Sequence, residues 1–158
     1  MRYYLIDRIT GVIPKKSAVA VKNISFSDDV FNDHFPEIPV YPGCMLTEAM
    51  AQLGGFLVEI SNNHTGEQVK RAMLVQIDRA KFYLPVEPGD QIIMTATLDS
   101  TLADAAQIAC ECHVAAKKVA TARLHFVLKS VEAPLLHEKR REVYKIWTKG
   151  LDLNFPLI

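Results

Sequence analysis

The second half of the chain alternates between apolar and polar positions with the period of a β-strand. In the segments 92–98, 108–114 and 120–128 the even positions are apolar or thiol residues, and most odd positions are polar. Successive side chains of a strand point to opposite faces of a sheet, so this pattern is typical of strands with one buried face. Another strand is expected over 72–85, which ends at Pro85 before the turn sequence EPGD. Near the start, LIDRITGVI and SAVAVKNI predict a shorter pair joined across PKK.

A different period, that of one long helix, appears over residues 45–62. Its main apolar stripe consists of Leu46, Met50, Leu53, Leu57 and Ile60. Small or apolar residues fill most of the other positions, and a helix that is apolar nearly all round is a buried helix. Gly54 and Gly55 in its interior cost about 1 kcal/mol each relative to alanine, so we expect another backbone to approach closely there. One buried helix wrapped by a curved antiparallel sheet, an α+β architecture, accommodates all these elements.

Composition and charge exclude several classes of function. A chain of 158 residues with 49% hydrophobic content is the size of one domain with a substantial core. Its 18 Lys and Arg balance 18 Asp and Glu, so no net charge attracts nucleic acid or an anionic membrane. No apolar stretch reaches the roughly 18 residues of a membrane span, and the opening MRYYLIDRIT lacks an apolar signal core. We therefore expect a cytoplasmic protein with no nucleic-acid partner and no membrane span.

Cys44, Cys110 and Cys112 make an odd number of cysteines without an export signal, which favours reduced thiols over disulfides. The sequence CECH at 110–113 raises the alternative of a metal site. On a strand, however, Cys110 and Cys112 share one face while His113 points to the other, so only two ligands converge. We interpret the pair as core cysteines and expect no metal.

The stretch HFPEIPVYPGCMLTEAMAQ, residues 34–52, combines a histidine, three prolines and a glycine with the start of the long helix. Each proline fixes φ and lacks a donor, so the loop is stiff. A helix N-terminus presents free backbone N–H groups, here those of Gly43 and Cys44, and its dipole favours negative charge. With His34 as a base and Glu48 as an acid, this set suits removal of a proton next to a carbonyl and protonation of a leaving hydroxyl.

The same stretch resembles the active-site segment of the 3-hydroxyacyl-[acyl-carrier-protein] dehydratases of fatty-acid synthesis, which have the hotdog fold. Similar segments occur in the family's order at LIDRI, KKSAVAVKNIS, FNDHFP and DRAKFYLPVEPGDQI, so the resemblance covers about residues 4–128. It implies a hotdog dehydratase domain over 1–130. Residues 131–158 then form an added C-terminal extension, an amphipathic helix and tail.

By position, the resemblance implies that His34 and Glu48 are the catalytic pair and that the N–H groups at Gly43 and Cys44 polarise the thioester carbonyl. The reaction would convert a (3R)-3-hydroxyacyl thioester on acyl-carrier protein into the trans-2-enoyl thioester, without a metal, nucleotide or flavin cofactor. Family members form homodimers in which Glu48 faces the partner's His34, and assembly into a trimer of dimers is left open. The implied tunnel residues, for which ordinary core packing is the alternative, are Phe35, Tyr41, Met50, Phe56, Phe82 and Tyr83.

Some features leave alternatives open. Glu37 and Tyr41 stand where the family usually has glycine and methionine, so the acyl chain length is not fixed. Glu59 is expected to be solvated or paired at a boundary, and His64, His113, His125 and His137 to be ordinary polar side chains. A hotdog thioesterase and a non-catalytic acyl-binding subunit are the other functions that the pattern allows. The residues that suit docking of an acidic carrier protein, or simply a solvated face, are Arg79, Lys81, Lys117, Lys118, Lys139, Arg140 and Arg141.

Overall fold

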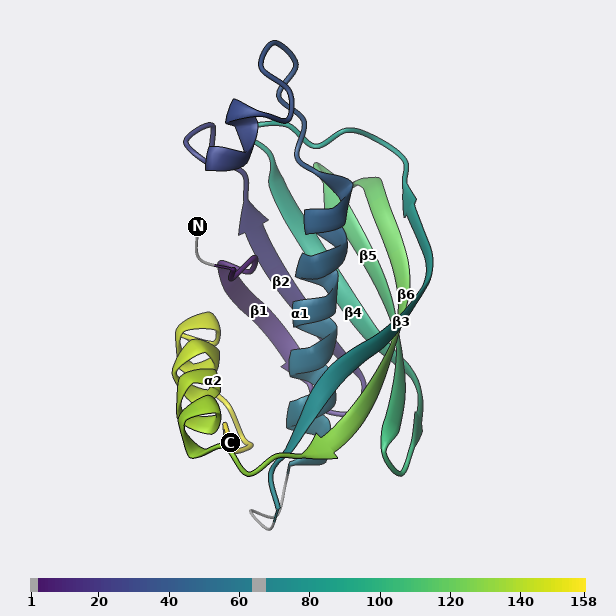
Figure 1. Cartoon of the computed structure of the whole chain (residues 1–158), viewed down its shortest axis with the longest axis vertical. Helices are drawn as coiled ribbons and strands as arrows, with labels where there is room; N and C mark the ends of the chain where they lie inside the picture. Colours follow the sequence, from purple (N-terminus) through teal and green to yellow (C-terminus); the bar gives the residue numbers. More distant parts are fainter. Residues whose placement is uncertain (1–2, 64–67) are drawn as a thin grey trace.

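The computed structural model describes residues 3–63 and 68–158, which form one six-stranded sheet and two α-helices (Figure 1). His64 lies outside the described residues. No helix in these two ranges is both long enough and apolar enough to cross a bilayer. In chain order the elements are β1 (Arg8–Ile13), β2 (Ser17–Asn23), the 3-10 helix η1 (Asp29–Asn32), α1 (Gly43–Asn62), β3 (Lys70–Phe82), β4 (Gln91–Leu102), β5 (Ala105–Val114), β6 (Lys117–Ser130) and α2 (Pro134–Trp147).

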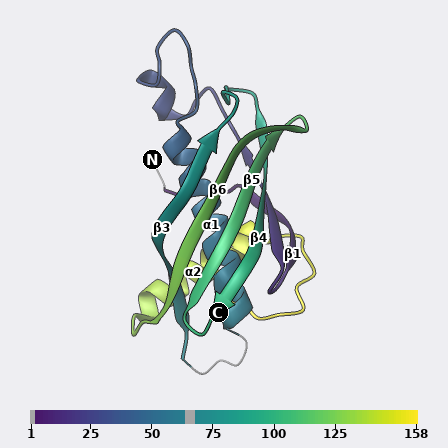
Figure 2. The same ribbon diagram turned by 90° about the vertical axis from the view of Figure 1, so that its right-hand side faces the viewer.

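All neighbouring strands run antiparallel, in the order β1-β2-β4-β5-β6-β3. The chain leaves β2, forms α1 and returns as β3 at the opposite edge of the sheet, after which β4, β5 and β6 fill the space between. The strand pairs expected from the alternating pattern are confirmed, and the turn between β5 and β6 uses Ala115 and Ala116 at positive φ. Figure 2 shows the outer face of the sheet, with α1 on the inner side.

The core lies between α1 and the inner face of the sheet. The fully buried side chains there include Leu53, Leu57, Ile92, Met94, Ile108 and Leu124. Cys110 and Cys112 belong to this core as expected, and burial raises the pKa of the Cys112 thiol to about 12. The expectation that another backbone approaches Gly54 closely was wrong. A β-carbon there would lie 3.2 Å from the ring of Phe126, so a side chain rather than a backbone occupies the space that the glycine leaves.

The strand β3 is an exposed edge with apolar side chains on both of its faces. It pairs with β6 on one side only. The exposed apolar residues of β3 and of the segment after it are Met73, Leu74, Val75, Ile77, Phe82, Tyr83 and Leu84. Proteins normally shorten, charge or cover such an edge, because its free backbone groups pair readily with another strand. In the single chain this edge is therefore unprotected.

The C-terminal extension folds back over the domain. After β6 the chain turns into α2, which lies on the side of β1 and contacts that strand (Figure 1). Tyr144 packs its ring edge-on against Phe56 of α1, with 4.8 Å between the ring centroids, and Trp147 packs in the same way against Tyr4 at 6.4 Å. The sequence correctly predicted a helix here, and its two buried side chains, Tyr144 and Trp147, pack against α1 and the N-terminal segment.

Candidate active site

His34 sits in a short loop that hydrogen bonds hold in a compact shape. Its backbone N–H donates to Val30 O at 3.0 Å, and Val40 N donates to His34 O at 3.1 Å. Between them, Phe35 and Ile38 exchange backbone hydrogen bonds of 3.2 and 3.1 Å. The prolines of the segment restrict the same backbone, so the position of His34 is fixed by local structure.

A single hydrogen bond sets the orientation of the His34 ring. The Nδ1 atom lies 2.7 Å from the carbonyl oxygen of Val40. Because a carbonyl oxygen only accepts, Nδ1 carries the hydrogen, and in the neutral ring the lone pair is on Nε2. The ring of Phe35 stacks on the imidazole with 4.2 Å between centroids. Nε2 is thus the atom of His34 that is able to remove a proton.

The N-terminus of α1 begins at Gly43, directly after the loop. Its N-cap is Pro42, which makes no side-chain hydrogen bond to the helix. The first N–H groups of a helix have no partner within it, so those of Gly43 and Cys44 are donors for a bound group. A β-carbon at Gly43 would lie 2.9 Å from the ring of Phe82. A side chain at this position would therefore displace the Phe82 ring, where β3 ends beside the helix.

Glu48 lies just over one turn further along α1 and is partly exposed. Gln52 donates from Nε2 to Glu48 Oε1 at 3.0 Å. The same amide group also holds the N-terminal segment, because its Oε1 accepts from Leu5 N at 2.9 Å and its Nε2 donates to Tyr3 O at 3.1 Å. The pKa of the Tyr3 hydroxyl is raised, first by partial desolvation and then by the negative charge of Glu48. Gln52 therefore orients Glu48 and ties residues 3–5 beside it.

Within one chain, His34 and Glu48 line two different cavities. The cavity with His34 has a volume of about 370 Å³ and is mostly apolar, with Gly43, Phe82 and Leu84 among its walls. The cavity with Glu48 has a volume of about 280 Å³ and includes Gln52. The two groups therefore do not share either of these cavities in the single chain.

The expected tunnel residues divide into two groups. Tyr41, Phe82 and Tyr83 line the cavity of His34, and Phe35 covers the imidazole. Met50 and Phe56 are fully buried in the core and line neither cavity.

The hydroxyl of Tyr41 is the only buried tyrosine oxygen in the described residues without a hydrogen-bond partner. Burial raises its pKa, and the nearby carboxylate of Asp28 raises it further. A phenol in this state is a free donor at the boundary between the His34 cavity and a neighbouring cavity of about 300 Å³.

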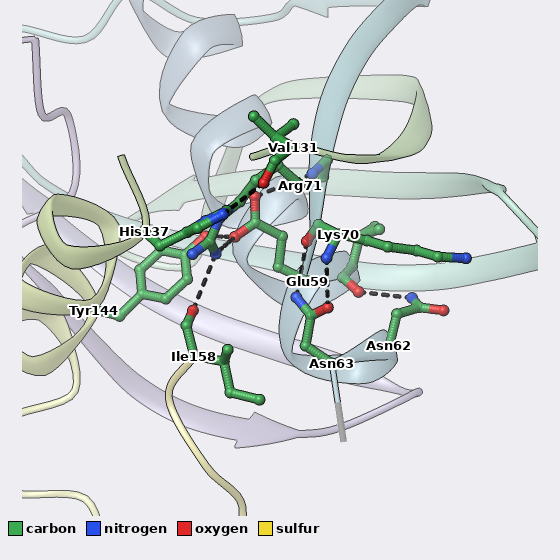
Figure 3. A network of polar contacts seen from close by, with 11 residues as sticks. Glu59, Asn62, Asn63, Lys70, Arg71, Val131, His137, Tyr144 and Ile158 are labelled. Atoms are coloured by element: carbon green, nitrogen blue, oxygen red, sulfur yellow. Dashed lines mark hydrogen bonds and ion pairs between the residues drawn. The ribbon is translucent and has the colours of Figure 1, made fainter. Parts of the chain in front are cut away.

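A buried polar cluster, shown in Figure 3, connects α1, β3 and the extension. Glu59 is 2% exposed and accepts hydrogen bonds from Arg71 Nη1 at 2.7 Å, Tyr144 Oη at 2.7 Å and Ala72 N at 3.0 Å. Arg71 Nε donates to His137 Nδ1 at 3.0 Å, and Arg71 Nη1 donates to Ile158 O at 3.0 Å. Of the two expectations for Glu59, the paired one holds and the solvated one is wrong.

The surroundings of Glu48 were not predicted from the sequence. Besides Gln52, Tyr3 and Tyr4, its cavity is lined by residues of the extension, namely Leu136, Lys139, Arg140, Val143 and Trp147. The apolar face of α2 was visible in the sequence, but its partner was not. The one usable signal was Glu59, an acid on an otherwise buried helix, which needed a cation from elsewhere in the chain.

Comparisons with known proteins identify relatives with a named activity. A family model described as a FabA-like domain matches residues 1–123. A "3-hydroxyacyl-[acyl-carrier-protein] dehydratase FabZ" from Sulfurovum sp. (strain NBC37-1) is 39% identical over 125 residues, which are 77% of this chain and 84% of that protein. The FabZ of Helicobacter pylori (strain Shi470) is 44% identical over 91 residues, 56% of this chain. The chain spans 57% of that relative and 61% of the FabZ of Aliarcobacter butzleri (strain RM4018), less than two thirds of either.

Solved structures share the arrangement of helix and sheet. The "Dehydratase Heterocomplex ApeI:P" from Xenorhabdus doucetiae superposes with a TM-score of 0.65 at 15% identity, over 87% of this chain and 89% of that one. The thioesterase HI1161 from Haemophilus influenzae superposes with a TM-score of 0.60 at 12% identity, over 79% of this chain and 80% of that one. These likenesses establish the α+β hotdog fold, which both dehydratases and thioesterases possess.

Proposed function

The chain belongs to the FabA-like family, and on this basis we propose that it dehydrates a (3R)-3-hydroxyacyl thioester carried by acyl-carrier protein to the trans-2-enoyl thioester. The observation that carries the proposal is the pairing of a fixed His34, whose Nε2 is free, with the unpartnered N–H groups at the start of α1. FabZ relatives of 39% to 47% identity support the same reaction. The free thiols Cys44, Cys110 and Cys112 agree with a cytoplasmic location, where thiols stay reduced.

In this mechanism His34 Nε2 takes the proton from C2 of the substrate. The electron pair released from the C2–H bond forms the C2=C3 double bond, while negative charge that develops on the thioester oxygen is stabilised by the N–H groups of Gly43 and Cys44. The C3–O bond breaks, and the hydroxyl leaves as water with a proton from the carboxyl group of Glu48. Acid and base catalysis each contribute on the order of 10²- to 10⁴-fold in rate.

We further propose that the working unit is a homodimer with composite sites, in which Glu48 of one subunit meets the partner's His34. Two observations support this. His34 and Glu48 line separate cavities within the chain, and β3 is an exposed apolar edge that ends beside the His34 cavity. Pairing of two β3 edges about a two-fold axis would bury that apolar surface and bring a second chain to both cavities. Whether such dimers assemble further, for example into a trimer of dimers, is decided by other surfaces.

A steady-state assay with 3-hydroxybutyryl and 3-hydroxydecanoyl carrier-protein thioesters tests the proposal. The expected product is the trans-2-enoyl thioester. Release of free thiol would instead identify a thioesterase. Binding of the substrate without turnover would identify an acyl-binding subunit, and either of these results would overturn the proposed reaction.

A further inference from the structure

The C-terminal extension lies outside the matched family region of residues 1–123, yet it builds one side of the cavity that contains Glu48. Five residues of α2 line that cavity, opposite Glu48 and Gln52 of α1 and Tyr3 and Tyr4 of the N-terminal segment. They are Leu136, Lys139, Arg140, Val143 and Trp147. The family domain alone therefore leaves this side of the proposed acid open, and this chain closes it with a helix of which two cations, Lys139 and Arg140, line the cavity.

Buried contacts fix α2 in place, so the helix that carries these cations has a defined position relative to Glu48. Tyr144 is 1% exposed and donates to Glu59, and its ring packs against Phe56. Arg140 lies over the ring of the same tyrosine, with its guanidinium carbon 5.9 Å from the ring centroid. Among the described residues no carboxylate lies within ion-pair distance of Arg140, whereas Lys139 pairs with Glu142 at 3.3 Å on the exposed side of the helix. An exposed ion pair contributes little stability, so Lys139 is able to leave Glu142 and bind a phosphate group instead.

A second cavity, of about 750 Å³, continues from the first along α2 towards solvent. The two cavities share Tyr3, Tyr4, Lys139, Val143 and Trp147. Together they form a path that starts at Glu48 and passes Lys139 and Arg140 between aromatic and aliphatic side chains. Two carboxylates also line the second cavity, and each has a cation of its own: Asp7 pairs with Lys22 and Glu142 with Lys139. The cavity of His34, in contrast, is lined by apolar side chains and no lysine or arginine.

The two ends of a carrier-bound substrate differ in polarity, as the cavity of His34 and the path along α2 do. The acyl chain is apolar, whereas the arm that joins the thioester to the carrier protein contains amides and ends in a phosphodiester anion. We propose that the path along α2 holds this arm, that Lys139 and Arg140 bind its phosphate, and that the acyl chain occupies the apolar cavity of the partner's His34. This inference rests on the proposed function and names the substrate group that the extension recognises. Lysine and arginine form the strongest hydrogen bonds of proteins with phosphate oxygens.

The test compares two soluble substrates, the 3-hydroxybutyryl thioesters of 4′-phosphopantetheine and of pantetheine, which differ only in the phosphate. In the full-length variant K139M/R140M, the ratio of kcat/KM for the phosphorylated over the unphosphorylated thioester is expected to fall about tenfold, the equivalent of one charge-assisted contact. Methionine keeps an unbranched apolar side chain at both positions and removes both charges. The matched control is K145M/K149M, which removes two exposed cations from the same region that line neither cavity, and its ratio should equal that of the unmodified chain.

An unchanged ratio in K139M/R140M, or an equal fall in the control, would overturn the inference. A loss that appears only with the intact carrier protein would also overturn it, because it would assign the cations to docking of the protein rather than to the arm. The proposed function is tested separately. If no thioester is dehydrated, calorimetric titration of acetyl-phosphopantetheine and acetyl-pantetheine still decides the inference, since the phosphate should tighten binding to the unmodified chain about tenfold and to K139M/R140M hardly at all.

Discussion

The ring of Phe82 lies against Gly43 so closely that a β-carbon at position 43 would come within 2.9 Å of it. This contact joins the end of β3 to the first residue of α1, whose N–H is the proposed donor to the thioester oxygen. It also places Phe82 in the cavity of His34. Gly43 therefore supplies a backbone N–H donor and also sets the position of the Phe82 ring in the wall of the His34 cavity.

Gly43→Ala should reduce dehydration at least tenfold while changing the thermal unfolding midpoint little. Phe82 is half exposed, so its ring is free to move away from the new methyl group, but the shift alters the cavity in which the substrate must be aligned. Kinetics and thermal unfolding of the same preparation check both parts. The double variant G43A/F82A should recover part of the activity, and its failure to do so would contradict the steric explanation.

Variants of His34 and Glu48 test both the chemistry and the composite site. His34→Ala and Glu48→Gln should each abolish dehydration and leave the dimer mass unchanged. When the two inactive proteins are mixed and allowed to exchange subunits, about a quarter of the normal activity should return, because half of the dimers are mixed and each contains one intact site of two. Native mass spectrometry measures the mixed fraction. Mixed dimers without activity would show that the pair does not act across subunits.

Replacement of Arg71 by methionine should destabilise the protein by about 3–5 kcal/mol, because it leaves Glu59 as a buried charge without its cation. Denaturant unfolding measures the change. Arg79→Met on the same strand removes an exposed arginine and should change the free energy of unfolding by no more than about 0.5 kcal/mol. Similar losses for both variants would contradict the role assigned to the buried pair.

Alkaline pH should weaken the attachment of the extension through Tyr144. Burial raises the pKa of this phenol well above its usual value of 10, and the adjacent Glu59 raises it further. The folded state thus holds the proton more tightly than the unfolded state. The resulting stabilisation is complete below about pH 10 and is lost as the pH rises towards the folded-state pKa, at about 1.4 kcal/mol per pH unit. Stability curves above pH 10 should therefore fall less steeply for Tyr144→Phe, and equal slopes would contradict this origin.

The fold was accessible from the sequence because each of its elements has a strong local signal. Strict alternation in β4, β5 and β6 identifies the buried face, and Pro42-Gly43 marks the start of α1. The position of His34 was also predictable, since proline and local hydrogen bonds fix its loop. Contacts between distant segments were not predictable. Gly54 required a neighbour, but the pattern alone did not distinguish a backbone from the ring of Phe126.

The environment of Glu48 could not be predicted for a similar reason. The docking of α2 depends on Tyr144, which is far along the chain from its partners Glu59 and Arg71. Only the assembled structure brings them together.

The buried cluster under α2 also has an evolutionary consequence. Glu59 and Arg71 belong to the part of the chain shared with the family, but their third partner, Tyr144, belongs to the extension. A relative that ends after its last strand lacks the partners that the extension supplies to this acid and base, namely Tyr144, His137 and Ile158. Sequences that carry the helix should therefore retain Glu59, Arg71 and Tyr144 together more often than sequences that lack it retain the first two.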